Sequence, residues 1–298
     1  MALIATLITH RSNPILNNSL VKQIMQVVNS SVFYWLSHSI ACDIILQSEE
    51  YTDYYKKKIL SIIANKPIDI VIHHHENRRK RLLVADMDST MIEQECIDEL
   101  ADTMEIKEKI SHITYSAMNG NISFEDSLRE SVSLLKGIST KIIDHIIENK
   151  ITYSTGGYEL VNTMKKNGSF TILVTGGSKI FASIIAKHLG FDKYYANRFI
   201  VKDNILTGEI AEPIIDSMTK YKILLENIQK LKINVEDTIV VGDGINDLDI
   251  IEKAGYGVAF HAKPSLAKKV NIRIDHSDLE SILYIQGYKK EEIVNYNK

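Results

Sequence analysis

An apolar run that ends in two aspartates constrains the fold of this chain more than any other part of its sequence. The run Leu82–Ala85 has the composition of a buried strand, and Asp86 and Asp88 follow it directly. Past the strand's end both side chains can turn towards one point, and open α/β sheets bind their ligands there. Two carboxylates at one point repel each other unless a cation joins them. Because hard oxygen ligands favour Mg²⁺, the pattern predicts a magnesium site at this sheet edge.

A second acidic turn supports the same site. Thr238–Val241 is β-branched throughout and predicts another buried strand, which runs directly into the turn Gly242–Asp247. The glycines of that turn permit a tight bend and a close approach of the backbone. Asp243 and Asp247 are therefore expected to complete the metal site together with Asp86.

A small-residue segment between the two acidic turns has the features of a phosphate site. The apolar run Leu173–Val174 predicts a strand end, Thr175–Ser178 predicts the loop that follows it, and Lys179–Leu189 predicts a helix. Backbone N–H groups and the amino end of a helix suit a phosphate anion. Further along, Lys220 lies in a helix-forming stretch and can neutralise phosphate charge, with Lys222 as the rival lysine.

Four motifs in this order resemble the haloacid dehalogenase (HAD) superfamily of phosphotransferases: Asp-x-Asp-Ser, Thr-Gly-Gly, a lysine, and Gly-Asp-Gly-x-x-Asn-Asp. The longer run Asp86–Leu100 is similar to the phosphoserine phosphatases within it, and the resemblance covers roughly residues 80 to 285. It implies an α/β fold, a doubly wound parallel sheet with a helical cap insertion. It also implies a Mg²⁺-dependent phosphatase that acts in serine biosynthesis.

The resemblance assigns catalytic roles to three residues. A phosphomonoester dianion repels an anionic nucleophile, so the site must supply positive charge, an in-line nucleophile and a proton for the leaving oxygen. Asp86 corresponds to the nucleophile that forms an aspartyl-phosphate. Asp88 corresponds to the general acid and base, with its backbone carbonyl rather than its carboxylate on the metal. Lys220 corresponds to the cation that pairs with the phosphate and with Asp86.

The other motif residues correspond, by the same resemblance, to metal and phosphate ligands. Asp243 corresponds to the second metal carboxylate, and Asp247 to a residue that helps through water or by orientation. Thr175 and Gly176 correspond to groups that bind phosphate oxygens through a hydroxyl and an N–H. Asn246 corresponds to a bridge to the phosphate.

Three residues of the segment after the first motif are expected, by resemblance, to face the substrate. Glu95 corresponds to an acceptor for a substrate ammonium, and Met118 and Phe124 to apolar positions that shield the phosphoserine site. Ordinary core packing is the competing interpretation for Met118 and Phe124.

One position departs from the family pattern. The usual run is Leu-Arg-x-Arg-Val, in which the second arginine holds the substrate carboxylate, whereas Leu128–Val132 places Ser131 there. Losing a charge-assisted pair costs about 1.5–3 kcal/mol, unless Ser131, water or another cation such as Lys136 takes over. Arg129 lies two positions away, about 200° around a helix, and is not expected to substitute.

Three functional hypotheses follow. The first is a phosphatase that hydrolyses O-phosphoserine to serine and phosphate. The second, favoured by Ser131, is a phosphatase for another small phosphomonoester. The third is an amino-acid-binding regulatory protein with a decayed catalytic half, which the intact Asp86, Lys220 and Asp243 speak against.

The chain divides into three predicted domains. Residues 1–75 have the βαββαβ order of ferredoxin-like α+β domains, which amino-acid-sensing modules of the ACT type share. Residues 76–96 and 166–298 are expected to form the HAD-like catalytic core. Residues 97–165 are rich in helical patterns and are expected to form the helical cap.

Composition excludes several other classes of protein. The net charge of −3 and the pI of about 6.4 give no general attraction to nucleic acid or to an anionic membrane. Two cysteines, Cys42 and Cys96, argue against a disulfide scaffold and fit a reducing cytosol. No apolar run reaches membrane-spanning length, and the start of the chain lacks the pattern of a signal peptide. We therefore expect a cytoplasmic protein. The resemblance implies a small phosphomonoester as its substrate, and a homodimer is left open.

Two polar segments are predicted to be solvated. The basic run Glu76–Arg81 is interpreted as a linker exposed to water rather than as a nucleic-acid contact. The polar stretch Tyr288–Lys298 is interpreted as a frayed end.

Overall fold

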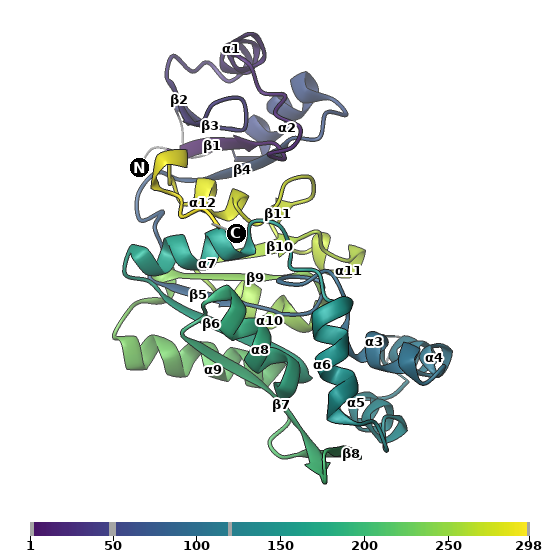
Figure 1. Cartoon of the computed structure of the whole chain (residues 1–298). Helices are drawn as coiled ribbons and strands as arrows, with labels where there is room; N and C mark the ends of the chain where they lie inside the picture. Colours follow the sequence, from purple (N-terminus) through teal and green to yellow (C-terminus); the bar gives the residue numbers. More distant parts are fainter. Residues whose placement is uncertain (1–2, 48–51, 119–120, 297–298) are drawn as a thin grey trace.

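A computed structural model describes residues 3–47, 52–118 and 121–296, and within them the chain builds two separate β-sheets (Figure 1). The first sheet lies at one end of the molecule, and the second forms its centre. None of the helices in this described part is long and apolar enough to span a membrane.

The first sheet is four-stranded and antiparallel, with the strand order β2-β3-β1-β4. Its elements are β1 (Leu3–Ile8), α1 (Asn18–Val27), β2 (Phe33–Ser37), β3 (Ala41–Leu46), α2 (Thr52–Ile63) and β4 (Asp69–His74). Leu20 and Ile24 of α1 and Ile59 and Ile63 of α2 are buried at helical spacing in one core. The predicted ferredoxin-like arrangement is confirmed.

The second sheet has seven strands in the order β11-β10-β9-β5-β6-β7-β8. They are β5 (Leu82–Ala85), β6 (Phe170–Ser178), β7 (Lys193–Lys202), β8 (Ile205–Ala211), β9 (Thr238–Gly242), β10 (Tyr256–Phe260) and β11 (Ile272–Ile274). All neighbours pair in parallel except β7 and β8. The predicted parallel α/β sheet is confirmed, and the two strands that precede the acidic turns, β5 and β9, lie side by side.

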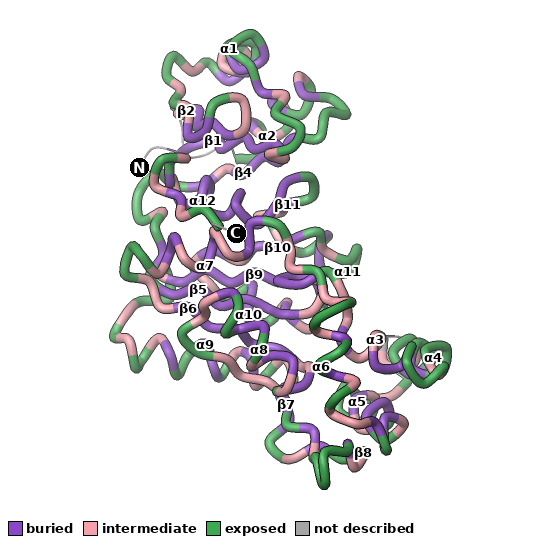
Figure 2. Tube along the Cα trace, in the orientation of Figure 1, coloured by how far each residue is buried: buried purple, intermediate pink, exposed green. Residues whose placement is uncertain are grey.

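Helices cover both faces of this sheet. On one side are α7 (Gly157–Lys166), α8 (Lys179–Leu189) and α12 (Ser281–Ile285); on the other are α9 (Ser217–Leu231), α10 (Leu248–Glu252) and α11 (Pro264–Ala267). Because successive strand side chains point to opposite faces, Leu83 and Ala85 of β5 pack on the side of α7, α8 and α12. Leu82 and Val84 pack on the side of α9, α10 and α11. Figure 2 shows the resulting buried central strands.

In the described part of the chain five helices stand between β5 and β6, and we call the first four the helical insert. They are α3 (Cys96–Thr103), α4 (Lys107–Met118), α5 (Phe124–Leu134) and α6 (Thr140–Asn149). Within the insert, α3 packs against α4 and α6, and α5 packs against β8. The helix that follows, α7, packs instead against β6 and α8. Short 3₁₀ turns at Val235–Asp237, Ile245–Asp247 (η2) and Lys290–Glu292 complete the elements.

The prediction of a loop at Thr175–Ser178 is wrong. β6 continues to Ser178, and its pairing with β7 is interrupted only between Val174 and Ser178. The physical reason lies in the neighbouring strand, where Asn197 Nδ2 donates to the Gly176 carbonyl at 2.8 Å and keeps the segment extended.

The prediction of a solvated linker at Glu76–Arg81 is wrong for Arg78 and Lys80, although the other four residues are exposed. Arg78 Nη1 lies 2.6 Å from Asp43 Oδ2 of the first sheet, and the Arg78 side chain is only 10% exposed. Lys80 is buried, and its Nζ donates to the Glu236 carbonyl at 2.8 Å. These two cations are withdrawn from solvent because Asp43 of the first sheet and the 3₁₀ turn before β9 supply their partners.

The end of the chain is packed rather than frayed as far as it is described. Tyr288 is buried, and Val294 N donates to Thr163 Oγ1 at 2.9 Å. The Tyr296 ring packs edge-on against Tyr158, with 4.7 Å between ring centroids. Residues 297 and 298 lie outside the described part of the chain.

Candidate active site

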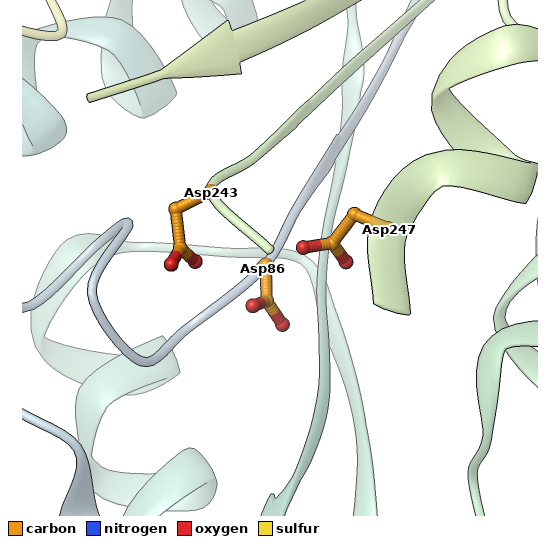
Figure 3. A group of neighbouring side chains, drawn as sticks. All are labelled: Asp86, Asp243 and Asp247. Carbon is orange, nitrogen blue, oxygen red and sulfur yellow. The ribbon is translucent and has the colours of Figure 1, made fainter. Parts of the chain in front are cut away.

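Three aspartates gather at the carboxyl ends of β5 and β9 (Figure 3). Asp86, Asp243 and Asp247 each offer one carboxylate oxygen within 4.8 Å of the other two, and all three residues are buried. Asp86 follows β5 and Asp243 follows β9, and these two strands pair in parallel. Their ends therefore meet at one sheet edge, so the two acidic turns converge.

A glycine at the end of β9 makes room for the third carboxylate. A Cβ at Gly242 would lie only 2.5 Å from Asp247 Oδ2. The same Oδ2 accepts a hydrogen bond from Gly244 N at 3.3 Å. Asp247 thus turns back over the strand end, and any larger residue at position 242 would displace it.

Lys220 is buried between two of the aspartates. Its Nζ donates to Asp86 Oδ1 at 2.6 Å and to Asp247 Oδ1 at 2.7 Å. Burial alone would lower the pKa of Lys220, but the charges of Asp247 and Asp86 outweigh burial and raise that pKa above its usual value. The ammonium is therefore held charged, whereas Lys222 is exposed on α9.

The charge balance of this cluster fits a divalent cation. Burial and the charge of Asp247 hold the pKa of Asp86 well above its usual range, although Lys220 opposes the shift. Among the described residues, Asp243 Oδ2 is buried without a well-aligned hydrogen bond, although the Lys263 ammonium lies 3.2 Å away. Three carboxylates with one buried ammonium between two of them leave the excess charge and free oxygen atoms that a hard cation takes.

Asp88 lies beside the cluster and is held by two hydrogen bonds. Its Oδ1 accepts from Cys96 N at 2.8 Å, and its Oδ2 accepts from the Thr175 hydroxyl at 3.1 Å. Burial and the charge of Glu95 raise the pKa of Asp88 to about 6. That carboxyl can therefore hold or release a proton close to neutral pH. A Cβ at Gly177 would lie 2.9 Å from Asp88 Oδ2, so the glycine is needed for this approach.

The predicted phosphate segment adjoins Asp88 through Thr175. The Thr175 hydroxyl, which donates to Asp88, accepts a hydrogen bond from Gly177 N at 2.8 Å. A Cβ at Gly176 would lie 3.1 Å from Cζ of Phe124, the first residue of α5. The helical insert therefore reaches the sheet edge at this point, and the Phe124 ring covers Gly176 while remaining 43% exposed.

The other predicted substrate and phosphate residues are less tightly held. Glu95 is the N-cap residue of α3, its side chain is 39% exposed, and it accepts from Ser89 Oγ at 3.0 Å. Asn246 is half-buried in η2, next to Asp247. The backbone of Met118 ends α4, but its side chain lies outside the described residues.

Ser131, which stands in the place of the family's arginine, is buried in α5. Its neighbour Arg129 is on the exposed side, where Nη2 donates to Glu125 at 2.8 Å and pairs with Glu212. Arg129 therefore does not replace the missing arginine, as helix geometry predicts. Lys136 is exposed and lies beside Gly208 of β8.

Sequence reasoning missed two residues of the site. Thr90 Oγ1 donates to Asp243 Oδ1 at 3.2 Å. Lys263 Nζ lies 3.0 Å from Glu95 Oε1 and 3.2 Å from Asp243 Oδ2. A signal for Lys263 was available, because it shortly follows β10, a parallel strand next to β9.

Comparisons with known proteins agree with this geometry. The profile of the haloacid dehalogenase-like hydrolase family matches residues 83–252. A Methanocaldococcus jannaschii protein named phosphoserine phosphatase is 41% identical over 207 residues, which cover 69% of this chain and 97% of that protein. A solved structure described as a substrate-bound phosphoserine phosphatase complex has a TM-score of 0.64 and 39% identity over 69% of this chain and 98% of its own.

A further structure covers both sheets. A HAD-family hydrolase from Salmonella enterica has a TM-score of 0.86 and 25% identity, and the match covers 97% of this chain and 99% of that one. The arrangement of the ferredoxin-like sheet on the catalytic sheet is therefore shared with another hydrolase.

Proposed function

The chain belongs to the haloacid dehalogenase-like hydrolase family, and on that premise we propose that it is a Mg²⁺-dependent phosphatase that hydrolyses O-phosphoserine to serine and phosphate. The observation that carries the proposal is the convergence of Asp86, Asp243 and Asp247 on one point with Lys220 between them. The proposal includes the assignment of residues 97–165 as a cap. The two free, buried cysteines, Cys42 and Cys96, support a cytoplasmic location.

A Mg²⁺ ion would be held by Asp86, Asp243 and the backbone carbonyl of Asp88, and Asp247 would help through water or by orientation. A bound Mg²⁺ supplies positive charge that offsets repulsion between the substrate phosphate and Asp86. Lys220 adds a fixed positive charge at 2.6 Å from Asp86 Oδ1. The phosphate oxygens bind to the Thr175 hydroxyl and the Gly176 N–H, with Asn246 at their other side.

Asp86 and Asp88 divide the chemistry between them. A carboxylate oxygen of Asp86 attacks phosphorus, the bond from phosphorus to the serine oxygen breaks, and Asp88 gives its proton to that oxygen. Asp88 then takes a proton from water, which attacks the aspartyl-phosphate and frees phosphate and Asp86. A pKa of about 6 for Asp88 lets one carboxyl perform both transfers.

The phosphoserine assignment is supported by relatives of that name that match the catalytic sheet and the insert. Glu95 beside the site gives an acceptor for the ammonium of an amino acid. Phe124 over Gly176 gives the apolar wall that shields the phosphate from water.

One observation favours a second candidate function. Ser131 takes the place of the arginine that binds the substrate carboxylate in the family pattern. A phosphatase for another small phosphomonoester would need no such arginine.

Phosphate release from O-phosphoserine, measured beside a panel of small phosphomonoesters with and without Mg²⁺, tests the proposal. We expect Mg²⁺-dependent turnover with O-phosphoserine preferred, and loss of all turnover in Asp86→Asn. A panel member turned over much faster than phosphoserine would establish the second function instead. Turnover that persists in Asp86→Asn would overturn the mechanism.

A further inference from the structure

Lys263 places a cation between the metal-ligand cluster and the predicted ammonium acceptor. Its Nζ lies 3.0 Å from Glu95 Oε1 and 3.2 Å from Asp243 Oδ2. Burial alone would lower the pKa of Lys263, but the charges of Glu95 and Asp243 outweigh burial and raise it above its usual value. The side chain is nevertheless 44% exposed, so one side of the ammonium faces solvent.

A phosphorylated amino acid brings three charged groups to the site. Its phosphate meets Thr175, Gly176 and Lys220, and its ammonium meets Glu95. Its carboxylate requires a donor, because an unpaired carboxylate loses binding energy on leaving water. The buried Ser131 supplies no charged donor for that carboxylate.

Two other cations of the described part of the chain are paired elsewhere, and a third lies against another strand. Lys220 is buried with both of its carboxylate partners. Arg129 is paired with Glu125 and Glu212 on the exposed side of α5. Lys136 lies beside Gly208 of β8. Lys263 remains as a cation that directly contacts the substrate end of the site.

The pair of Glu95 and Lys263 is complementary to an amino acid. The ammonium and carboxylate of an α-amino acid are attached to the same carbon, so an anion and a cation that lie close together can bind both groups. Glu95 and Lys263 meet this condition at 3.0 Å. Resting on the proposed function, we propose that Lys263 binds the substrate carboxylate and sets the preference for phosphorylated amino acids over other phosphomonoesters.

The backbone around Lys263 keeps its side chain at this place. Lys263 N donates to the Asp243 carbonyl at 2.9 Å, and Pro264 directly after it begins α11. A metal cation held by Asp243 competes with Lys263 for that carboxylate. The ammonium then keeps Glu95 as its partner and has donors left for the substrate carboxylate.

Two substrates that differ only in the carboxylate test the assignment. O-phosphoethanolamine has the phosphate and the ammonium of O-phosphoserine but no carboxylate. The ratio of their kcat/KM values in the Mg²⁺-loaded enzyme therefore isolates binding of that group. We expect Lys263→Met to lower the ratio of phosphoserine to phosphoethanolamine by about ten- to a hundredfold, mainly through the KM for phosphoserine. Lys263→Arg keeps a cation and should retain most of the ratio.

A matched control is Lys268→Met, since Lys268 is an exposed lysine just after α11. It should leave the ratio unchanged. Thermal unfolding of each variant checks that the fold is intact. Inhibition by serine and by ethanolamine gives a second readout. In Lys263→Met the inhibition by serine should weaken, and the inhibition by ethanolamine should not change.

Equal loss on both substrates in Lys263→Met, or an unchanged ratio, would overturn the assignment and leave Lys263 as a positioning residue for Glu95. A wild-type enzyme that ignores phosphoserine but hydrolyses other phosphomonoesters would instead overturn the proposed function, and the Lys263 assignment with it. The wild-type measurement therefore separates the two failures.

Discussion

The two ends of the site are built in different ways. The chemical end consists of Asp86, Asp243, Asp247 and Lys220, all buried and joined by short contacts. The recognition end, around Glu95 and Lys263, is more open, since their side chains are 39% and 44% exposed. At the chemical end the charged side chains hold one another in place, so the remaining groups cannot rearrange to replace one that is substituted. Groups at the recognition end are partly exposed, so we expect a substitution there to change substrate preference more than the chemistry.

The largest effect is expected at Asp88, which belongs to the chemical end. Asp88→Asn removes the proposed general acid and base, so turnover should fall by about 10²–10⁴-fold. Mg²⁺ affinity should be largely retained, because the backbone carbonyl is the proposed ligand. Steady-state kinetics and metal titration measure the two quantities. A matching loss of metal affinity would contradict the assigned role.

The pKa of Asp88 also fixes the direction of the pH dependence. Because that pKa is about 6, the acid form is present below about pH 6 and the base form above it. Formation of the aspartyl-phosphate should therefore slow as pH rises above 6, and its hydrolysis should slow as pH falls below 6. Rapid-quench measurement of each step checks this, and opposite slopes would remove Asp88 from both roles.

Removing the buried ammonium should destabilise the fold far more than removing an exposed cation. Lys220→Met leaves Asp86 and Asp247 buried without their partner, which costs about 3–5 kcal/mol when a buried pair is broken. Arg129→Gln is the matched control, because its partners Glu125 and Glu212 are more than half exposed and such pairs contribute about 0–1 kcal/mol. Urea unfolding without metal compares them. Equal losses of unfolding free energy in the two variants would contradict the contrast between buried and exposed ion pairs.

Polar groups are also buried far from the chemical end, and the buried His73 should make the stability of the fold depend on pH. Burial, followed by the charge of Arg78, lowers the pKa of His73 to about 3, and its ring packs edge-on against Tyr256 of the second sheet. Below about pH 6.5 the His73 imidazole binds a proton in the unfolded chain but stays neutral in the folded protein. Stability should therefore fall by about 1.4 kcal/mol per pH unit from this group as pH decreases from 6.5 towards 3. Unfolding of wild type and His73→Gln at pH 7.5 and pH 5 measures this term as their difference in slope.

The smallest effect is expected at Ser131. Ser131→Arg restores the family's arginine and should lower the KM for phosphoserine by about tenfold if this position reaches the substrate carboxylate. The KM for phosphoethanolamine serves as the control. An unchanged ratio of the two values would mean that the buried Ser131 points away from the substrate.

The chemical end could be predicted because its logic is local. Asp86 and Asp243 each directly follow a strand, and parallel strand ends meet at one edge, so these two residues converge without further information. The contacts of Lys263 depend instead on where the turn after β10 lies relative to α3, which no spacing in the chain specifies.

The errors have the same origin. Arg78 was expected in water because its partner Asp43 lies 35 residues earlier, on another sheet. The Thr175–Ser178 segment was expected to be a loop because small residues favour turns, but the side chain of Asn197 keeps it extended. Both cases show tertiary partners overriding local preference.

Mass spectrometry of acid-quenched enzyme during turnover tests the central claim most directly. The wild-type protein, mixed with Mg²⁺ and O-phosphoserine and quenched in acid, should carry one phosphoryl group on Asp86, and Asp86→Asn should carry none. Turnover of phosphoserine with no phosphoryl group on the protein, or with the group on another residue, would contradict the account.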